Sequence, residues 1–209
     1  MPGAGLQPVM WNKCECPDSL ILFVKQKQKQ MEETDIVKLT ETGTDLLRKM
    51  LGTRICYFIT DSIKIEASGS NVRYWALEFA VGLTTNKRDQ SFINISADYK
   101  LSSKSSTTYY GFEIEESKVP LRKEKLLQSG QYSEIKVLSG QVLMLEIYQD
   151  WNQEFDETIH YDAAIVLYTD SQKYMLKVRE ELVGGVDVIL DEAAIEAELV
   201  DLKLRQSLV

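Results

Sequence analysis

Between Gly52 and about residue 190, apolar and polar residues alternate with a period of two. Alternation of this kind predicts β-strands with one buried face. About ten such segments follow one another at close spacing, which favours an antiparallel β-sandwich or a curled barrel over parallel strands joined by helices. We therefore expect a mainly β fold, with an α+β fold as the alternative. The clearest segment is VRYWALEFAVGLT, residues 72–84, in which one face carries Trp75, Leu77, Phe79, Val81 and Leu83.

The later strands also predict how the sheet is connected. Ser139-Gly140 is predicted to be a turn before QVLMLEIY, residues 141–148, which is apolar on both faces and is therefore expected in the middle of the sheet. The next two strands, YDAAIVLY and KYMLKV, are predicted to form a hairpin around residues 169–172.

The sequence before this region divides into two parts. Residues 1–16 hold two of the four prolines and show no periodicity, so we expect a flexible N-terminal arm. Residues 17–52 are expected to be an N-terminal helical segment, although the pattern does not decide between helix and strand for residues 17–33. TDLLRKMLG, residues 44–52, predicts a helix capped by Thr44 and followed by Gly52 in the left-handed conformation. The apolar face of this helix is expected to carry Leu46, Leu47, Met50 and Leu51.

Residues 53–190 then form the β-rich domain, and residues 191–209 are expected to be a C-terminal amphipathic helix capped by Asp191. One face of this helix carries Ile195, Leu199 and Leu202, and a second face is also apolar. A surface this wide predicts contact with the same domain or with a neighbouring subunit.

Composition weighs against several classes of partner. The formal net charge is −8, which argues against direct binding of nucleic acid and against docking on anionic membranes. No segment is apolar enough to predict membrane insertion. The three cysteines lack a disulfide framework, so we expect a cytoplasmic or other intracellular location, with a virion as a further possibility.

The predicted hairpin resembles the active-site layout of metal-dependent nucleases of the PD-(D/E)XK kind. Asp162 would be the first acid and Lys177 the lysine. These nucleases need a second acid two residues before the lysine, where this chain has Met175, a poor ligand for Mg²⁺. Glu134 and Lys136 have the required spacing, with Glu113 or Glu115 upstream, but an exposed strand face shows the same pattern by chance.

A second candidate cation site lies between two predicted strands. Its oxygen-bearing residues alternate as in the first half of an EF-hand loop, but Phe155 replaces the glycine and Tyr161 replaces the last glutamate of that motif. We therefore expect a polar connection in which Trp151 and Phe155 pack back onto the sheet. The alternating residues are Asp150, Asn152, Glu154 and Asp156.

Other residues offer little for catalysis or cofactor binding. His160 is the single histidine, and Cys56 alternates within an apolar strand and is expected in the core. Gly184-Gly185 precedes a strand and not a helix, so it does not predict a phosphate-binding loop. We therefore expect no cofactor. Several tyrosines, Tyr109 among them, could line a groove for a small ligand.

These observations favour a non-enzymatic structural or protein-interaction subunit of a larger assembly, for example a virion or tail particle. The alternative is an acidic immunity-type inhibitor that binds a basic toxin or nuclease. A divalent-metal hydrolase or nuclease comes third. The residues expected to contact a protein partner or a second copy are Lys118, Arg122, Lys123, Lys125, Ile195, Leu199 and Leu202.

Overall fold

The computed structural model describes residues 35–60, 63–68, 71–86, 89–102, 107–118, 132–154, 157–180 and 184–209. The predicted arm and the undecided residues 17–33 lie outside these ranges and stay predictions.

The described residues form a mainly β fold, as predicted, with twelve strands in one open, largely antiparallel sheet and two helices. The order is β3-β4-β11-β10-β9-β8-β2-β5-β6-β7, and the two end strands do not pair with each other, so the sheet is curled but not closed. Beside this path, β1 pairs with β9 in parallel and β12 pairs with β8. The strands are β1 (Asp35–Val37), β2 (Arg54–Thr60), β3 (Lys64–Ser68), β4 (Asn71–Ala76), β5 (Glu78–Asn86), β6 (Asp89–Leu101), β7 (Thr108–Ser117), β8 (Ser133–Glu154), β9 (Glu157–Thr169), β10 (Lys173–Val178), β11 (Val186–Ile189) and β12 (Lys203–Leu208).

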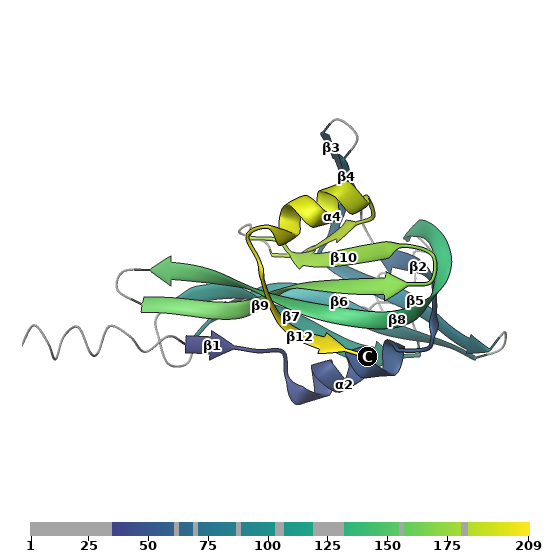
Figure 1. Ribbon diagram of the computed structural model, residues 1–209, viewed down its shortest axis with the longest axis horizontal. Helices are drawn as coiled ribbons and strands as arrows, with labels where there is room; N and C mark the ends of the chain where they lie inside the picture. Colours follow the sequence, from purple (N-terminus) through teal and green to yellow (C-terminus); the bar gives the residue numbers. More distant parts are fainter. Residues whose placement is uncertain are drawn as a thin grey trace, which may run out of the picture. The chain divides into compact units, whose positions relative to one another are not determined.

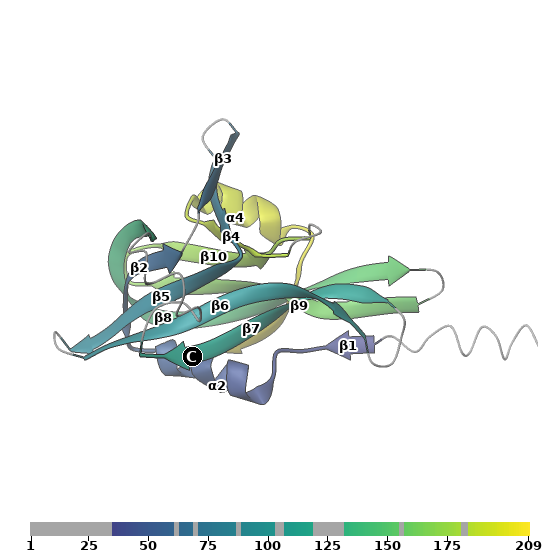
Figure 2. The ribbon, with the colours of Figure 1, turned by 180° about the vertical axis from the view of Figure 1, so that it is seen from behind.

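Strand β8 explains how one sheet makes two layers. Its first part pairs with β2, and its second part, from Val142 onward, pairs with β9. Figures 1 and 2 show β5, β6 and β7 on one side of the molecule and β9 and β10 on the other. The turn predicted at Ser139-Gly140 is wrong, because β8 continues through it. A Cβ on Gly140 would lie 2.5 Å from Thr169 Oγ1, so the glycine lets β8 pass close to the β9–β10 turn.

The main core lies between these two layers. Phe58 from β2 makes edge-to-face contacts with Phe79 of β5 and Tyr174 of β10, at centroid distances of 6.5 and 5.9 Å. All three side chains are fully buried. The strand predicted over residues 72–84 is interrupted at Leu77, which is exposed and not buried as expected, because β4 pairs with β11 whereas β5 pairs with β2.

Helix α2 (Glu41–Met50) starts earlier than predicted. Its cap is Thr40, whose hydroxyl accepts a hydrogen bond from Gly43 N at 3.0 Å, whereas Thr44 lies inside the helix. Gly52 has the predicted left-handed conformation, with φ of 76°. The predicted apolar face is confirmed, since Leu46, Leu47 and Met50 are buried.

Helix α4 (Glu192–Leu199) begins as predicted, with the Asp191 carboxylate accepting a hydrogen bond from Ala194 N at 2.8 Å. Contrary to the expectation of one helix over residues 191–209, α4 ends at Leu199. Residues from Lys203 onward form β12, because their backbone pairs with the edge that β8 exposes after its bend. Neither helix of the described residues combines the length and apolar character required to cross a membrane.

Candidate functional site

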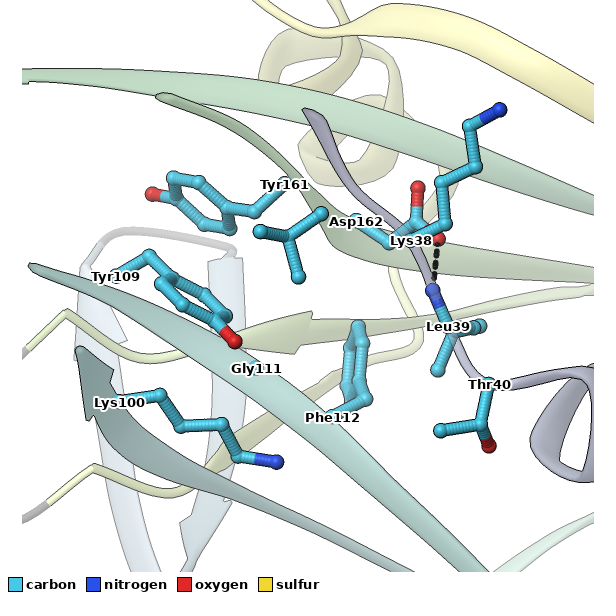
Figure 3. Close-up of a pocket in the computed structure, with 10 residues that line it drawn as sticks. Lys38, Leu39, Thr40, Lys100, Tyr109, Gly111, Phe112, Tyr161 and Asp162 are labelled. Atoms are coloured by element: carbon cyan, nitrogen blue, oxygen red, sulfur yellow. Dashed lines mark hydrogen bonds between the residues drawn. The ribbon is translucent and has the colours of Figure 1, made fainter. Parts of the chain in front are cut away.

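A pocket of about 210 Å³ opens beside the edge strand β7, and we call it the β7 pocket. One wall is the segment that joins β1 to α2, and the others come from β6, β7 and β9. Figure 3 shows Tyr109 and Tyr161 at one end of the hollow and Phe112 and Leu39 at the other. The lining residues are Val37, Lys38, Leu39, Thr40, Lys100, Tyr109, Gly111, Phe112, Tyr161 and Asp162.

Asp162 holds the β1–α2 wall in place. Its buried carboxylate accepts hydrogen bonds from Arg205 Nε at 2.7 Å and Nη2 at 2.8 Å, and from Leu39 N at 2.7 Å. Three charge-assisted bonds compensate for the burial of this carboxylate. One carboxylate therefore joins β9, the C-terminal strand β12 and the segment that follows β1.

The aromatic wall of the pocket is uncharged at neutral pH. The rings of Tyr109 and Tyr161 lie 6.0 Å apart, and the Tyr161 hydroxyl donates a hydrogen bond to Glu180. Burial, followed by the hydrogen bond and charge of Glu180, raises the pKa of Tyr161 above its ordinary value of 10.0. Burial also raises the pKa of Tyr109, with a smaller contribution from the charge of Asp35.

Two lysines bring positive charge to the pocket. Lys100 Nζ lies 3.1 Å from Glu113 Oε1, and both side chains are partly exposed. Lys38 is exposed at the rim. A Cβ added at Gly111 would lie 2.9 Å from Tyr109 Cε2 and 3.2 Å from Lys100 Cδ. The absence of a side chain at Gly111 therefore lets the Tyr109 and Lys100 side chains lie close against β7, where they form part of the pocket wall.

A second hollow of about 310 Å³, the charged cleft, contains Asp150 and Lys177 from the sequence analysis. Each of its cations is already ion-paired. Glu198 of α4 binds Arg73 and also lies 2.6 Å from Lys177 Nζ, and Arg179 pairs with Glu66 and Asp187. The charged cleft therefore connects α4 to β4 and β10 and leaves little charge for a ligand. Its lining residues are Glu66, Arg73, Asp150, Lys177, Val178, Arg179, Glu180 and Asp187.

Three carboxyl groups in and beside the charged cleft have shifted pKa values. Burial raises the pKa of Asp150, and the charges of Glu180 and Asp201 add to the shift. Burial also raises the pKa of Asp187, although Arg179 and Arg73 partly oppose it. Burial would also raise the pKa of Glu198, but the hydrogen bonds and positive charges of Lys177 and Arg73 outweigh it, so the pKa of Glu198 is lowered.

The residues considered for a metal hydrolase are not brought together. Glu113 lies on β7, whereas Glu134 and Lys136 lie on β8, and β2, β5 and β6 separate these strands in the sheet. Among the described residues, no group of three or more histidine, cysteine or acidic side chains is arranged to hold a metal ion. The predicted β9–β10 hairpin is confirmed, and its Asp162 and Lys177 bind Arg205 and Glu198.

The second cation candidate is not a loop, which corrects the prediction of a polar connection. Asp150, Asn152 and Glu154 belong to β8 itself, and Asn152 Nδ2 donates a hydrogen bond to Thr108 O at 3.0 Å. Trp151 does not pack back onto the sheet but is 56% exposed. Phe155 and Asp156 lie outside the described residues.

The structure describes four of the predicted partner-contact residues. Ile195 is fully buried against β9 and β10 side chains of its own chain. Leu199 and Leu202 are partly buried around the same cluster, and their contact with a partner stays a prediction. Lys118 is exposed, as a contact residue requires, whereas Arg122, Lys123 and Lys125 lie outside the described residues. Cys56, expected in the core, is only partly buried.

An exposed apolar surface that the sequence did not predict lies where β1 and β8 flank β9, and we call the face formed by Ile36, His160 and Trp151 the end surface. The exposed fractions are 53% for Ile36 and 56% for Trp151. Ile36 and Trp151 are both paired with His160, one from each side, so the three side chains form a row on one sheet face. The available signal was a tryptophan in an otherwise polar stretch.

No protein-family model, curated protein or solved structure shows a significant match to this chain. Function is therefore inferred from the geometry and chemistry of the β7 pocket, the charged cleft and the end surface.

Proposed function

We propose that this protein is a non-enzymatic interaction domain that acts as a subunit of a larger assembly. The observation that carries the proposal is the end surface, where the large apolar side chains of Ile36 and Trp151 are more than half exposed on one sheet face. Gathered apolar and aromatic side chains on a surface are typical of protein contacts, in which tryptophan and tyrosine are enriched.

Strand pairing supports the view that Ile36 and Trp151 belong to one surface. Ile36 of β1 and Trp151 of β8 pair with His160 of β9 from its two sides. Residues that are directly paired across neighbouring strands place their side chains on the same face of the sheet. The two exposed apolar side chains therefore flank His160 on one sheet face.

The experiment is a measurement of mass in solution by light scattering on a sizing column. We expect discrete oligomers for the natural chain and a shift toward monomer for the double variant Ile36→Ser, Trp151→Ser. Ile65→Ser is the matched control, because Ile65 is 61% exposed on β3, at one end of the strand order. Oligomers that persist in the double variant would contradict the role of the end surface.

A second candidate is the inhibitor of a basic protein, and the distribution of charge favours it. Residues 1–34 contain four lysines and four acidic residues, so the net charge of −8 belongs entirely to residues 35–209. An acidic domain attracts a basic partner over long range. This function predicts a protein that does not self-associate and binds one basic partner in a salt-sensitive way.

A further inference from the structure

We propose that the β7 pocket binds a small organic anion, with one carboxylate attached to a compact apolar body such as a single ring. This inference goes beyond the proposed assembly function and does not depend on it. It rests on the shape of the pocket, on Gly111 and on the charges around it.

The volume and walls of the pocket set the size and character of the ligand. At about 210 Å³, the pocket is smaller than the roughly 300–1,000 Å³ that drug-sized ligands occupy. Val37, Leu39 and Phe112 supply apolar surface, and the tyrosine rings supply an aromatic end. A single aromatic ring or a short branched chain suits a site of this size and composition.

Gly111 determines the shape of one pocket wall. It lies inside the ten-residue strand β7, where glycine weakens a strand and often marks a close approach by another group. Its φ is not positive, so the backbone does not require glycine. The groups that approach it are the Tyr109 and Lys100 side chains, which a Cβ would displace from the pocket wall.

The charges around the pocket select an anion. The carboxylate of Asp162 is paired with the Arg205 guanidinium and accepts a hydrogen bond from Leu39 N–H, so it does not oppose a second negative charge as a free carboxylate would. Lys100 and Lys38 line the pocket, and because the Lys38 ammonium group points away from the hollow in Figure 3, Lys100 is the cation that a ligand would meet. Glu113 reaches Lys100 from one side, and an ammonium group has three donors, so a ligand carboxylate can share this lysine.

The test uses N-acetylphenylalanine as the probe and its neutral amide as the matched control ligand. Binding is followed from amide chemical shifts of the full-length protein, with Leu39, Gly111 and Phe112 as reporters of the pocket. We expect saturable shifts at these residues with the acid and at least about tenfold weaker binding of the amide, since a charge-assisted hydrogen bond contributes about 1.5–3 kcal/mol.

Three variants locate the site. Gly111→Val should abolish the shifts by displacing the Tyr109 and Lys100 side chains from the pocket wall, and Lys100→Gln should weaken binding of the acid without changing binding of the amide. Lys136→Gln removes an exposed lysine on β8 and should change nothing. If Gly111→Val does not fold, Gly111→Ala together with Lys100→Gln gives the same information.

Short peptides that end in phenylalanine distinguish a chain terminus from a free small acid, with the amidated peptide as the control. Tighter binding of the peptide with a free C-terminus than of N-acetylphenylalanine identifies a chain terminus, and the reverse order identifies a free small acid. Equal binding of N-acetylphenylalanine and its amide, shifts confined to other parts of the protein, or no shifts up to the solubility limit of the acid would overturn the proposal.

Discussion

Replacing Asp162 by alanine tests whether this carboxylate holds the β1–α2 segment and the C-terminal strand together. The change leaves the Arg205 guanidinium without its anion and Leu39 N–H without its acceptor. Removing one partner of a buried ion pair costs about 3–5 kcal/mol, and a buried unpaired N–H adds to the loss. Because the Arg205 side chain is 15% exposed, water can partly solvate it, and we expect about 3 kcal/mol.

The assay is urea unfolding at neutral pH, analysed for the free energy of unfolding in water. Asp45→Ala is the matched control, because Asp45 also pairs with an arginine, at 2.6 Å, but both side chains are at least half exposed. An exposed pair contributes less than about 1 kcal/mol. A loss for Asp162→Ala no larger than that for Asp45→Ala would refute the reasoning.

A double variant separates the lost charge pair from the lost backbone bond. Asp162→Ala combined with Arg205→Met removes both charges, and pairs replaced by apolar residues often cost little. We therefore expect the double variant to be more stable than Asp162→Ala alone but less stable than the natural chain, since Leu39 N–H still lacks its acceptor. Hydrogen exchange at Leu39 should be accelerated in both variants.

Three further variants test the charged cleft and the bend of β8. Glu198→Gln should destabilise the protein at neutral pH. Because the pKa of Glu198 in the folded protein is lowered below its ordinary value of 4.5, the difference in stability between the natural chain and the variant should disappear as pH falls through that pKa. Asp150→Asn should act in the opposite way, because a raised folded pKa means that the ionised carboxylate opposes folding; the variant should be more stable at neutral pH, with no gain below pH 3.8. Thermal unfolding across this pH range measures both. Gly140→Val should lose about 1–3 kcal/mol in urea unfolding, because its side chain would collide with Thr169.

Local patterns were sufficient to predict much of the fold. The alternation of residues 53–190 predicted strands, the apolar stripe of Leu46, Leu47 and Met50 predicted a helix, and Asp191 predicted the start of another. Each of these features depends on neighbouring residues alone. The central position of residues 141–148 also followed from their two apolar faces, because this part of β8 pairs with β9 on one side and with β12 on the other.

Features decided by distant partners were not predictable in this way. Residues 203–208 have an apolar spacing that fits a helix, but pairing with β8 makes them a strand. Gly140 by itself predicts a turn, whereas the structure shows that glycine is needed there because Thr169, distant in sequence, lies against it. The β7 pocket combines residues 37–40, 100, 109–112 and 161–162, and only Tyr109 among them had been suspected of lining a groove.

The most direct test of the central claim is the mass of the full-length protein in solution, compared with that of the Ile36→Ser, Trp151→Ser variant. An assembly subunit that uses the end surface should form discrete oligomers that fall to monomers in the double variant, while Ile65→Ser leaves them intact. A natural chain that stays monomeric at all concentrations would contradict self-assembly and favour the acidic-inhibitor function instead.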